Sequence, residues 1–146
     1  MEAITPEDVR AEVQRFWTQF TGKYKSKFQE FYKPTAAVFS IDGRRSEPAR
    51  LMWVRREREF FDPRAVAAAK LGAIKVQVLR PNLAVATYAF HFSVVRILPN
   101  GNRVQSEIPF SRATQVFQRD DNGTLQIIHE HLSSGEPVVS KELPEQ

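Results

Sequence analysis

The spacing of apolar residues changes along the chain, and its first part follows the period of a helix. Between Thr5 and about Tyr32, apolar side chains recur every three or four positions, which predicts one buried stripe made of Val9, Val13, Phe16, Trp17, Phe20, Tyr24, Phe28 and Phe31. Thr5 is a suitable N-cap, and Pro6 suits the first helical position. Gly22 weakens the pattern locally, and Pro34 marks its end. We therefore expect an N-terminal helix with a mostly aromatic buried face.

From Ala36 onward the apolar period approaches two, which is typical of strands. Turn signals interrupt this part at Asp42-Gly43, Pro81-Asn82, Asn100-Gly101 and Asn122-Gly123. After a first strand from Ala36, they delimit expected strands at Ala73 to Leu79, Leu83 to Leu98, Arg103 to Arg119 and Thr124 to Ser133. The helical spacing of Leu51, Val54, Arg58 and Phe61 predicts a short second helix before Ala73. Pro109 cannot donate to a strand ladder, so we expect a bulge near it.

These elements predict an α+β fold. Two of the expected strands are much longer than usual, and such strands stay folded in a sheet that twists and curls. The economical arrangement is a cone-shaped, curved antiparallel sheet, or half-barrel, with the N-terminal helices packed in its concave face. A chain of 146 residues suits one compact domain. We expect residues 1–146 to form a single domain, with a loosely held C-terminal tail from about residue 136.

Composition narrows the class of protein without indicating an activity. Hydrophobic residues make up 42% and charged residues 26% of the chain, as in ordinary globular proteins. No apolar run approaches the roughly 18 residues of a membrane span, and "MEAITPEDVR" lacks the basic start of a signal peptide. We expect a cytoplasmic protein without a membrane partner. The net charge of +4 is interspersed with acidic residues, so we expect no nucleic-acid partner. The absence of cysteine excludes disulfides and thiolate chemistry.

Two of the three histidines stand close together in "IIHEHLS", residues 127–133. His129 and His131 are two positions apart on an expected strand, so they share one face. His91 lies on the same face, but one intervening strand puts it roughly 10 Å away, too far for a common zinc ion. We therefore expect no metal and no cofactor. A direct catalytic role is a second interpretation. The third, which we favour, places the histidines in or beside a dimer interface.

The segment "SRATQVFQRDDNGTLQIIHEHLSSGEP" resembles the last two strands of the nuclear transport factor 2-like superfamily, in particular SnoaL-like domains and the association (hub) domain of calcium/calmodulin-dependent protein kinase. The family pattern reads roughly Trp-x-Ile-Val-His-x-His-x-Ser-Gly. It is matched by Leu125 in place of Trp, Ile127, Ile128, His129, His131 and Ser133, with Ser134 inserted before Gly135. "VLRPNLAVATY" is also similar, through Val78, Asn82, Ala84 and Tyr88. The resemblance implies the cone fold, on which isomerases, dehydratases, cyclases, transport factors and oligomerisation modules occur.

Strand alternation separates the residues expected inside the cone from those outside. The inner face should carry Tyr88, Phe90 and Phe92, opposite the aromatic stripe of the helix. The expected pocket consists of Trp17, Tyr24, Tyr88, Phe90, Phe92, Gln115, Phe117, Glu130 and Leu132. In the hub domain, arginines on this face line a polar pocket. The matching positions here are Phe90, Gln115 and Leu132, which argues against an anion pocket of that type.

The same alternation assigns Arg112, Thr114, Val116, Ile127, His129 and His131 to the convex side. Apolar residues among the outward positions, such as Val85 and Val116, are too numerous for a surface facing water. We therefore expect a homodimer through a convex face that includes His91, Arg112, Thr114, Val116, His129 and His131.

Three functions fit these expectations. The first is a small homodimeric domain whose apolar, cone-shaped pocket binds a small hydrophobic molecule, although the same aromatics could simply fill the core. The second is an isomerase, dehydratase or cyclase acting by acid–base catalysis on a hydrophobic carbonyl substrate. Glu130 would then be the base, with Tyr88 or Tyr24 donating a hydrogen bond to the enolate. The third is a hub-like oligomerisation module. The sequence leaves open whether the protein is an enzyme.

Overall fold

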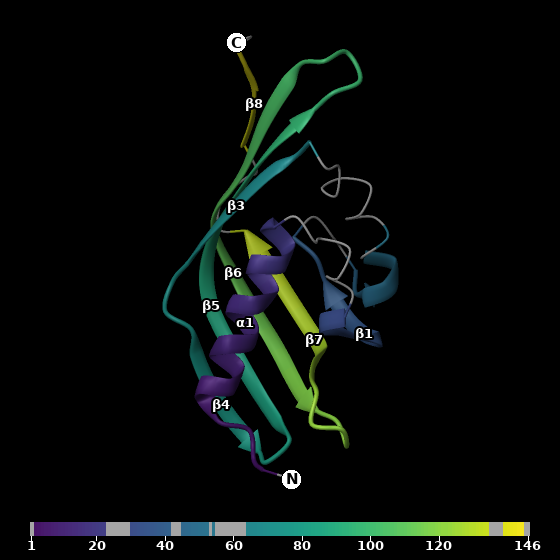
Figure 1. Ribbon diagram of the computed structural model, residues 1–146, viewed down its shortest axis with the longest axis vertical. Helices are drawn as coiled ribbons and strands as arrows, with labels where there is room; N and C mark the ends of the chain where they lie inside the picture. Colours follow the sequence, from purple (N-terminus) through teal and green to yellow (C-terminus); the bar gives the residue numbers. More distant parts are fainter. Residues whose placement is uncertain are drawn as a thin grey trace.

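The computed structural model describes residues 2–22, 30–41, 45–52, 54, 64–134 and 139–144. In it a helix lies across an open, mixed, curved sheet (Figure 1). The elements are α1 (Pro6–Thr21), β1 (Tyr32–Phe39), β2 (Glu47–Pro48), β3 (Val66–Leu71), β4 (Lys75–Arg80), β5 (Leu83–Ile97), β6 (Arg103–Arg119), β7 (Leu125–Ser134) and β8 (Val139–Leu143). The sheet order is β2-β1-β7-β6-β5-β3, with β4 also paired to β5 and β8 to β6. The predicted α+β class is confirmed.

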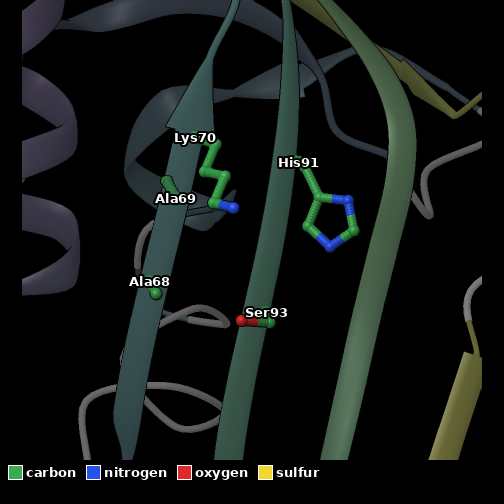
Figure 2. A pocket seen from close by; sticks show the side chains of 5 residues that line it. All are labelled: Ala68, Ala69, Lys70, His91 and Ser93. Carbon is green, nitrogen blue, oxygen red and sulfur yellow. The ribbon is translucent and has the colours of Figure 1, made fainter.

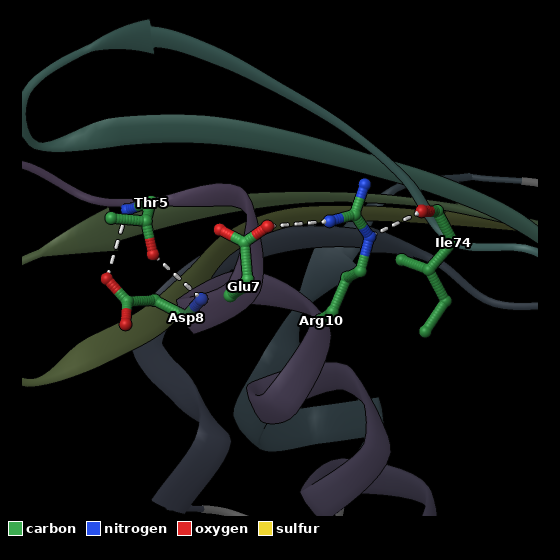
Figure 3. A network of polar contacts seen from close by, with 5 residues as sticks. All are labelled: Thr5, Glu7, Asp8, Arg10 and Ile74. Carbon is green, nitrogen blue, oxygen red and sulfur yellow. Dashed lines mark hydrogen bonds and ion pairs between the residues drawn. The ribbon is translucent and has the colours of Figure 1, made fainter.

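Helix α1 begins where the sequence predicts. Thr5 and Asp8 form a capping box: Thr5 Oγ1 accepts from the Asp8 N–H at 3.1 Å, and Asp8 Oδ2 accepts from the Thr5 N–H at 3.0 Å (Figure 3). One turn later, Arg10 Nε donates to the Ile74 carbonyl at 3.1 Å, and its Nη1 donates to Glu7 at 3.4 Å. These contacts hold the first turns of the helix against the segment that leads into β4.

The helix ends well before Tyr32, where the sequence predicted its end. Its buried stripe is made of Val9, Val13, Phe16, Trp17 and Phe20. The last helical residue is Thr21, and Gly22 follows as the C-cap. A Cβ on Gly22 would lie 2.7 Å from the carbonyl oxygen of Thr18, so the backbone approaches itself too closely for a side chain. Tyr32 instead begins β1, which corrects the prediction.

The three central strands match the sequence prediction closely. β6 has the predicted bounds, and the ends of β5 and β7 differ from the prediction by one residue. β1 starts at Tyr32 and pairs with β7 in parallel, with Ala37 beside His129 and Phe39 beside His131. The sheet is therefore mixed, because β1 runs parallel to β7 while the other described strand pairs are antiparallel.

Three strands were not predicted: the two-residue β2, which pairs with β1, and the longer β3 and β8. The segment Val66–Leu71 lies between the predicted second helix and the strand predicted from Ala73. It forms β3 and pairs with β5, with Ala68 opposite Ser93 and Lys70 opposite His91. Val139–Leu143 lies in the predicted loose tail, but it forms β8 and pairs with β6. Ser140 Oγ lies 2.8 Å from Ser106 Oγ across this pair.

The predicted second helix is only partly described. Residues 49–52 and 54 are helical. Their buried side chains are Ala49 and Met52, whereas Leu51 and Val54 are 53% and 43% exposed. Arg58, Phe61, Tyr24 and Phe28 lie outside the described residues, as does the predicted turn at residues 42–43.

Two bulges set which side chains point inward. The predicted bulge near Pro109 is confirmed: Phe90 pairs with Ser111 and Phe92 with Ile108, so two residues of β6 oppose one of β5. A second irregularity falls at Ile128, because Val116 pairs with His129 and Phe117 with Ile127. The extra residue reverses the alternation before His129. Ile127 is therefore fully buried, which corrects its assignment to the convex side.

The core lies between α1 and the concave face of the sheet. The ring of Trp17 packs on Phe90 with 4.8 Å between centroids, and Phe20 packs on Phe92 at 5.3 Å. The inward residues of β5 are buried in strict alternation from Ala84 to Val94, as a strand covered on one face requires. Within the described ranges, no helix has the length and apolarity needed to cross a membrane.

Candidate functional site

Five buried polar side chains, one from each of five elements, meet under α1. They are Trp17 from α1, Tyr88 from β5, Gln115 from β6, Glu130 from β7 and Tyr32 from β1. The strands β1, β7, β6 and β5 are neighbours in the sheet, and each contributes one inward polar residue. Gln115 and Glu130 are direct cross-strand partners. Tyr88 and Tyr32 stand opposite Ala113 and Ile127, so their long side chains reach this pair diagonally across the concave face.

These five side chains form a continuous chain of hydrogen bonds. Trp17 Nε1 donates to Tyr88 Oη at 2.8 Å, and Tyr88 Oη donates to Gln115 Oε1 at 2.8 Å. Gln115 Nε2 then donates to Glu130 Oε1 at 2.7 Å. From the other side, Tyr32 Oη lies 2.9 Å from Oε1 and 2.8 Å from Oε2 of the same carboxyl group. The carboxyl group of Glu130 is thus the point where donors from two directions meet.

The direction of the chain follows from one residue. An indole N–H can only donate. The Tyr88 hydroxyl oxygen must therefore accept from Trp17, and its O–H donates a hydrogen bond to Gln115. The amide oxygen of Gln115 is then occupied, and its NH₂ group is the part left to face Glu130. Trp17 therefore sets the orientation of every group between itself and the carboxyl group. The chain delivers a donor to Glu130, which favours the ionised carboxylate.

The environment of the chain is almost dry. Gln115 and Glu130 are 0% and 1% exposed, and Tyr88 and Tyr32 are 5% and 4% exposed. Burial raises the pKa of Tyr88 well above its usual value, and the negative charge of Glu130 raises it further, while the hydrogen bond from Trp17 opposes both. Tyr88 is therefore a neutral phenol throughout the physiological range. A buried carboxylate is costly unless it is hydrogen-bonded, and the donors from Gln115 and Tyr32 provide this compensation.

This arrangement can do acid–base chemistry in principle. Tyr32 has one hydroxyl proton for two nearby carboxyl oxygens. The pair can exist as carboxylate and phenol, with Tyr32 donating, or as a protonated Glu130 that donates to Tyr32. A carboxyl group and a phenol within 2.9 Å of each other form a general acid–base pair.

The sequence placed most of the inward residues correctly, but it missed Tyr32 and assigned Ile127 to the wrong face. Trp17, Phe90, Phe92 and Phe117 are buried, and Leu132 is half-buried against the core. Whether these residues line an open pocket or fill the core stays a prediction, and Tyr24 lies outside the described residues. Tyr32 was missed because the predicted helix was drawn through it. The adjacent Pro34 and the weak point at Gly22 were the signals that it starts a new element.

The residues expected on the convex face lie on the opposite side of the sheet from the chain of hydrogen bonds. Arg112 and His131 are exposed, and His91, Thr114, Val116 and His129 are partly buried. His91 Nε2 lies 3.9 Å from Glu107 Oε2, and the ring of His131 packs against Phe39 with 5.3 Å between centroids. In the part of the chain that the structure describes, no three His, Asp or Glu side chains are placed to share a metal ion.

An α+β cone with a helix in its concave face is the nuclear transport factor 2-like fold, and solved structures of this class superpose on the chain. The sequence itself matches no family model and no curated protein. A nuclear transport factor 2-like superfamily protein from Salmonella enterica serovar Typhimurium superposes with a TM-score of 0.64 at 20% identity, covering 90% of this chain and 91% of that one.

Two further structures show how differently this fold is used. The association domain of CaMKII from C. elegans has a TM-score of 0.62 at 14% identity, covering 88% of this chain and 94% of that one. A type 2 hexachlorocyclohexane dehydrochlorinase (LinA) has a TM-score of 0.65 at 8% identity, covering 93% and 89%. The fold implied by the sequence resemblance is confirmed. Because one neighbour is an enzyme and the other an association domain, the fold does not select a function.

Proposed function

We propose that the protein binds a small hydrophobic molecule inside the cone and holds a polar group of that molecule at Glu130 and Tyr32. The observation that carries the proposal is the convergence of hydrogen-bond donors on one buried carboxyl group among aromatic side chains. Apolar walls with a few fixed polar groups are the usual composition of a ligand site. Trp17, Tyr88 and Gln115 donate in one direction towards this carboxyl group, and Tyr32 donates to it from the other side.

The polar pair indicates the chemical class of the ligand. The Tyr32 hydroxyl can donate to a ligand oxygen, and Glu130 can accept from a ligand hydroxyl or take a proton from an acidic carbon. The surrounding rings of Phe90, Phe92 and Trp17 favour a ligand with an aromatic or aliphatic body. We therefore expect a hydrophobic ketone, enone or phenol, rather than an anion or a sugar.

Acid–base catalysis on such a ligand is the second candidate, favoured by the short contacts between Glu130 and Tyr32. Glu130 would remove a proton from the carbon next to a carbonyl group, while Tyr32 donates a hydrogen bond to the enolate oxygen. Return of the proton to another carbon would complete an isomerisation. Like the small-molecule site, this activity is a proposal that rests on the geometry of the pair.

The protein is also proposed to work as a homodimer through the convex face of the sheet, in the cytoplasm. The support for the dimer is the partly buried row of Thr114, Val116 and His129 on a face that α1 does not cover. The likeness to association domains agrees with self-assembly, and a purely hub-like role is the alternative if no ligand is found.

Replacing Glu130 with Gln tests the binding site. The chain has two tryptophans, Trp17 and Trp53. In a Trp53→Phe background, tryptophan fluorescence reports on Trp17 alone, so a panel of hydrophobic ketones, enones and phenols can be titrated with and without Glu130→Gln. We expect the variant to bind a positive ligand at least ten times more weakly, because hydrogen bonds to a charged group contribute about 1.5–3 kcal/mol. His131→Gln, on the exposed opposite face, is the matched control and should bind like wild type.

Two outcomes would contradict the proposal. One is a panel in which no compound binds in the micromolar range, and the other is a ligand that binds Glu130→Gln as tightly as wild type. The catalytic candidate has its own measurement, which is exchange of the protons next to the ligand carbonyl with deuterium, followed by NMR. Exchange that is absent in wild type, with binding intact, would leave a binding protein without acid–base activity.

A further inference from the structure

A strained aromatic residue projects from the sheet at the bulge in β6. Phe110 is 70% exposed, and its φ of 51° is the only positive value of a non-glycine residue in the described part of the chain. A residue with a Cβ adopts this left-handed region at an energetic cost, and an exposed phenyl ring gains nothing from facing water. Two unfavourable features at one position indicate that the ring is presented to a partner.

The register of the sheet indicates the side on which the ring projects. Phe90 pairs with Ser111 and Phe92 with Ile108, so Pro109 and Phe110 together oppose His91. Phe90, Phe92 and Ser111 are buried on the concave side. Because neighbours in a strand alternate, His91 and the bulge belong to the convex face.

A hollow of about 300 Å³ lies beside His91 on its other side, on the surface of β3 and β5. Its lining consists of Ala68, Ala69, Lys70, His91 and Ser93. Figure 2 shows the ends of Lys70 and Ser93 between β3 and β5, near the alanines, while the ring of His91 turns away from β3. Lys70 pairs with His91 and Ala68 with Ser93, so the hollow sits at the level of His91 along the strand. It exists because Ala68 carries only a methyl group.

We propose that Phe110 of one copy of the chain occupies the hollow beside His91 of a second copy. This inference rests on the proposed homodimer and limits its contact to β3, β5 and β6, so that His129 and His131 of β7 lie beyond the edge of the partner's sheet. When two sheets face each other, a two-fold axis that runs along β5 over His91 places the β6 of one copy opposite the β3 of the other. Phe110 on β6 and Lys70 on β3 flank the same residue of β5, His91. The ring of Phe110 and the hollow therefore lie at the same level along this axis.

The two partners are chemically matched. The ring of Phe110 and the hollow lie on opposite sides of β5, each about 4.8 Å from it, the usual distance between neighbouring strands. The two-fold axis therefore makes the same contact twice in one dimer, as a closed symmetric interface requires. The exposed methyl group of Ala68 leaves room for the ring, and the ammonium group of Lys70 at the rim can lie against the ring face. The energy of burying the ring in the dimer offsets the strain that the monomer carries at Phe110.

Two single variants test the contact from its two sides. Phe110→Gly removes the ring and relieves the positive φ, so the chain should fold at least as stably as wild type while its dimer dissociation constant rises at least tenfold. Ala68→Phe, at an exposed position, should fold normally and fill the hollow, with the same loss of dimer. Sedimentation velocity measures the dimer, circular dichroism and thermal unfolding report the fold, and Leu79→Ala, which removes an exposed side chain from β4, is the control.

Mixing the two variants gives the decisive result. In a mixed dimer, the Phe110 of the Ala68→Phe chain meets the open hollow of the Phe110→Gly chain, and the filled hollow meets the missing ring. The mixture should therefore form heterodimers when neither variant dimerises alone. A wild-type chain that is monomeric at micromolar concentration overturns the proposed homodimer and this inference together. A wild-type dimer that both variants preserve overturns this inference alone, as does a mixture without heterodimers. If Ala68→Phe fails to fold, Ala68→Leu fills the hollow with a smaller side chain.

Discussion

Trp17 has an unusual position for a core tryptophan, because its only polar atom begins a chain that ends at a carboxyl group. Most buried polar groups satisfy one another in pairs, and here four hydrogen-bonding steps depend on one another. Removing one member leaves the next without its partner, which costs the desolvation energy of a buried polar group. The orientation of Gln115 therefore depends on a helix residue that it does not touch.

Tyr88 provides a direct test of this dry environment through pH. Its pKa is raised in the folded protein by burial and by the charge of Glu130, above an unfolded value near 10. The resulting stabilisation is fully present below pH 10 and is lost as the pH rises above it. In an absorbance titration of tyrosinate, we expect the signal of Tyr88 to appear only together with unfolding.

The matched variant for this titration is Tyr88→Phe. It should remove the late-titrating tyrosine and destabilise the fold by about 1–3 kcal/mol, because Trp17 Nε1 and Gln115 Oε1 both lose their partner. A wild-type protein in which every tyrosine ionises near pH 10 without unfolding would contradict the buried hydrogen-bond chain.

Inward residues could be predicted where side chains alternate along a strand without a bulge. Gln115 and Glu130 were placed inside because side chains alternate strictly along a strand, whatever their chemistry. Ile127 was misplaced because a bulge adds one residue without leaving a mark in the sequence pattern. Pro109 did leave such a mark, since proline has no N–H to give to the ladder. Tyr32 was assigned to the first helix despite the signals at Gly22 and Pro34, and its contact with Glu130, 98 positions away, has no local signal in the sequence.

At the scale of elements, α1 is fixed most firmly at its first turn. The capping box joins Thr5 and Asp8, and Arg119 of β6 donates to Asp8 Oδ2 at 3.1 Å and to the Glu2 carbonyl at 2.9 Å. The backbone N–H of Thr5 is the main cause that lowers the pKa of Asp8, with further contributions from the Thr5 side chain and Arg119. The stability from Asp8 is present above pH 4 and is lost as the pH falls below its unfolded pKa of 3.8.

Thr5→Ala tests the cap. We expect the free energy of unfolding at neutral pH to fall by about 1 kcal/mol, the usual cost of losing an N-cap side chain. The difference from wild type should shrink in acid, because the Thr5 side chain also stabilises the ionised carboxylate of Asp8 and protonation removes that contribution. Urea unfolding at both pH values measures this, with Thr18→Ala on the exposed face of α1 as the control. An equal loss of stability in Thr18→Ala would mean that the cap has no special role.

The elements that the sequence did not reveal are those whose partners decide their structure. The "AVAAAKL" segment is rich in alanine, a strong helix former, yet it forms β3 because β5 offers an unpaired edge. β8 is short and mostly exposed, and pairing with β6 rather than burial places it. Long strands such as β5 and β6 were predictable, since their own alternation is long enough to be unambiguous.

For the molecule as a whole, the metal question can be answered by removing metal. We expect EDTA to leave the midpoint of thermal unfolding unchanged, because a metal that bound only the folded state would stabilise it by mass action. Thermal unfolding with and without chelator measures this. A fall of several degrees that zinc restores would show that His129 and His131 bind a metal after all.

The whole-molecule fold could be predicted from the sequence, whereas the site could be predicted only in part. The order of elements and the motif around His129 were sufficient for the cone, since few arrangements bury a long helix and long curved strands. The chemistry depends on side chains that meet from five elements, and their contacts follow from the three-dimensional register rather than from any local motif. The fold also accommodates unrelated functions, so it adds little to the choice among them.

The parallel pairing of β1 with β7 has a consequence for how the chain reaches this structure. β1 can pair only after β7 has formed. Glu130 therefore contacts Tyr32 only after the chain has closed a separation of 98 residues. A collapsed chain in which β1 is missing or out of register would bury the same carboxylate with fewer donors, at a high cost in free energy. The buried acid therefore penalises compact misfolded states more than it stabilises the native one, and it widens the energy gap between them.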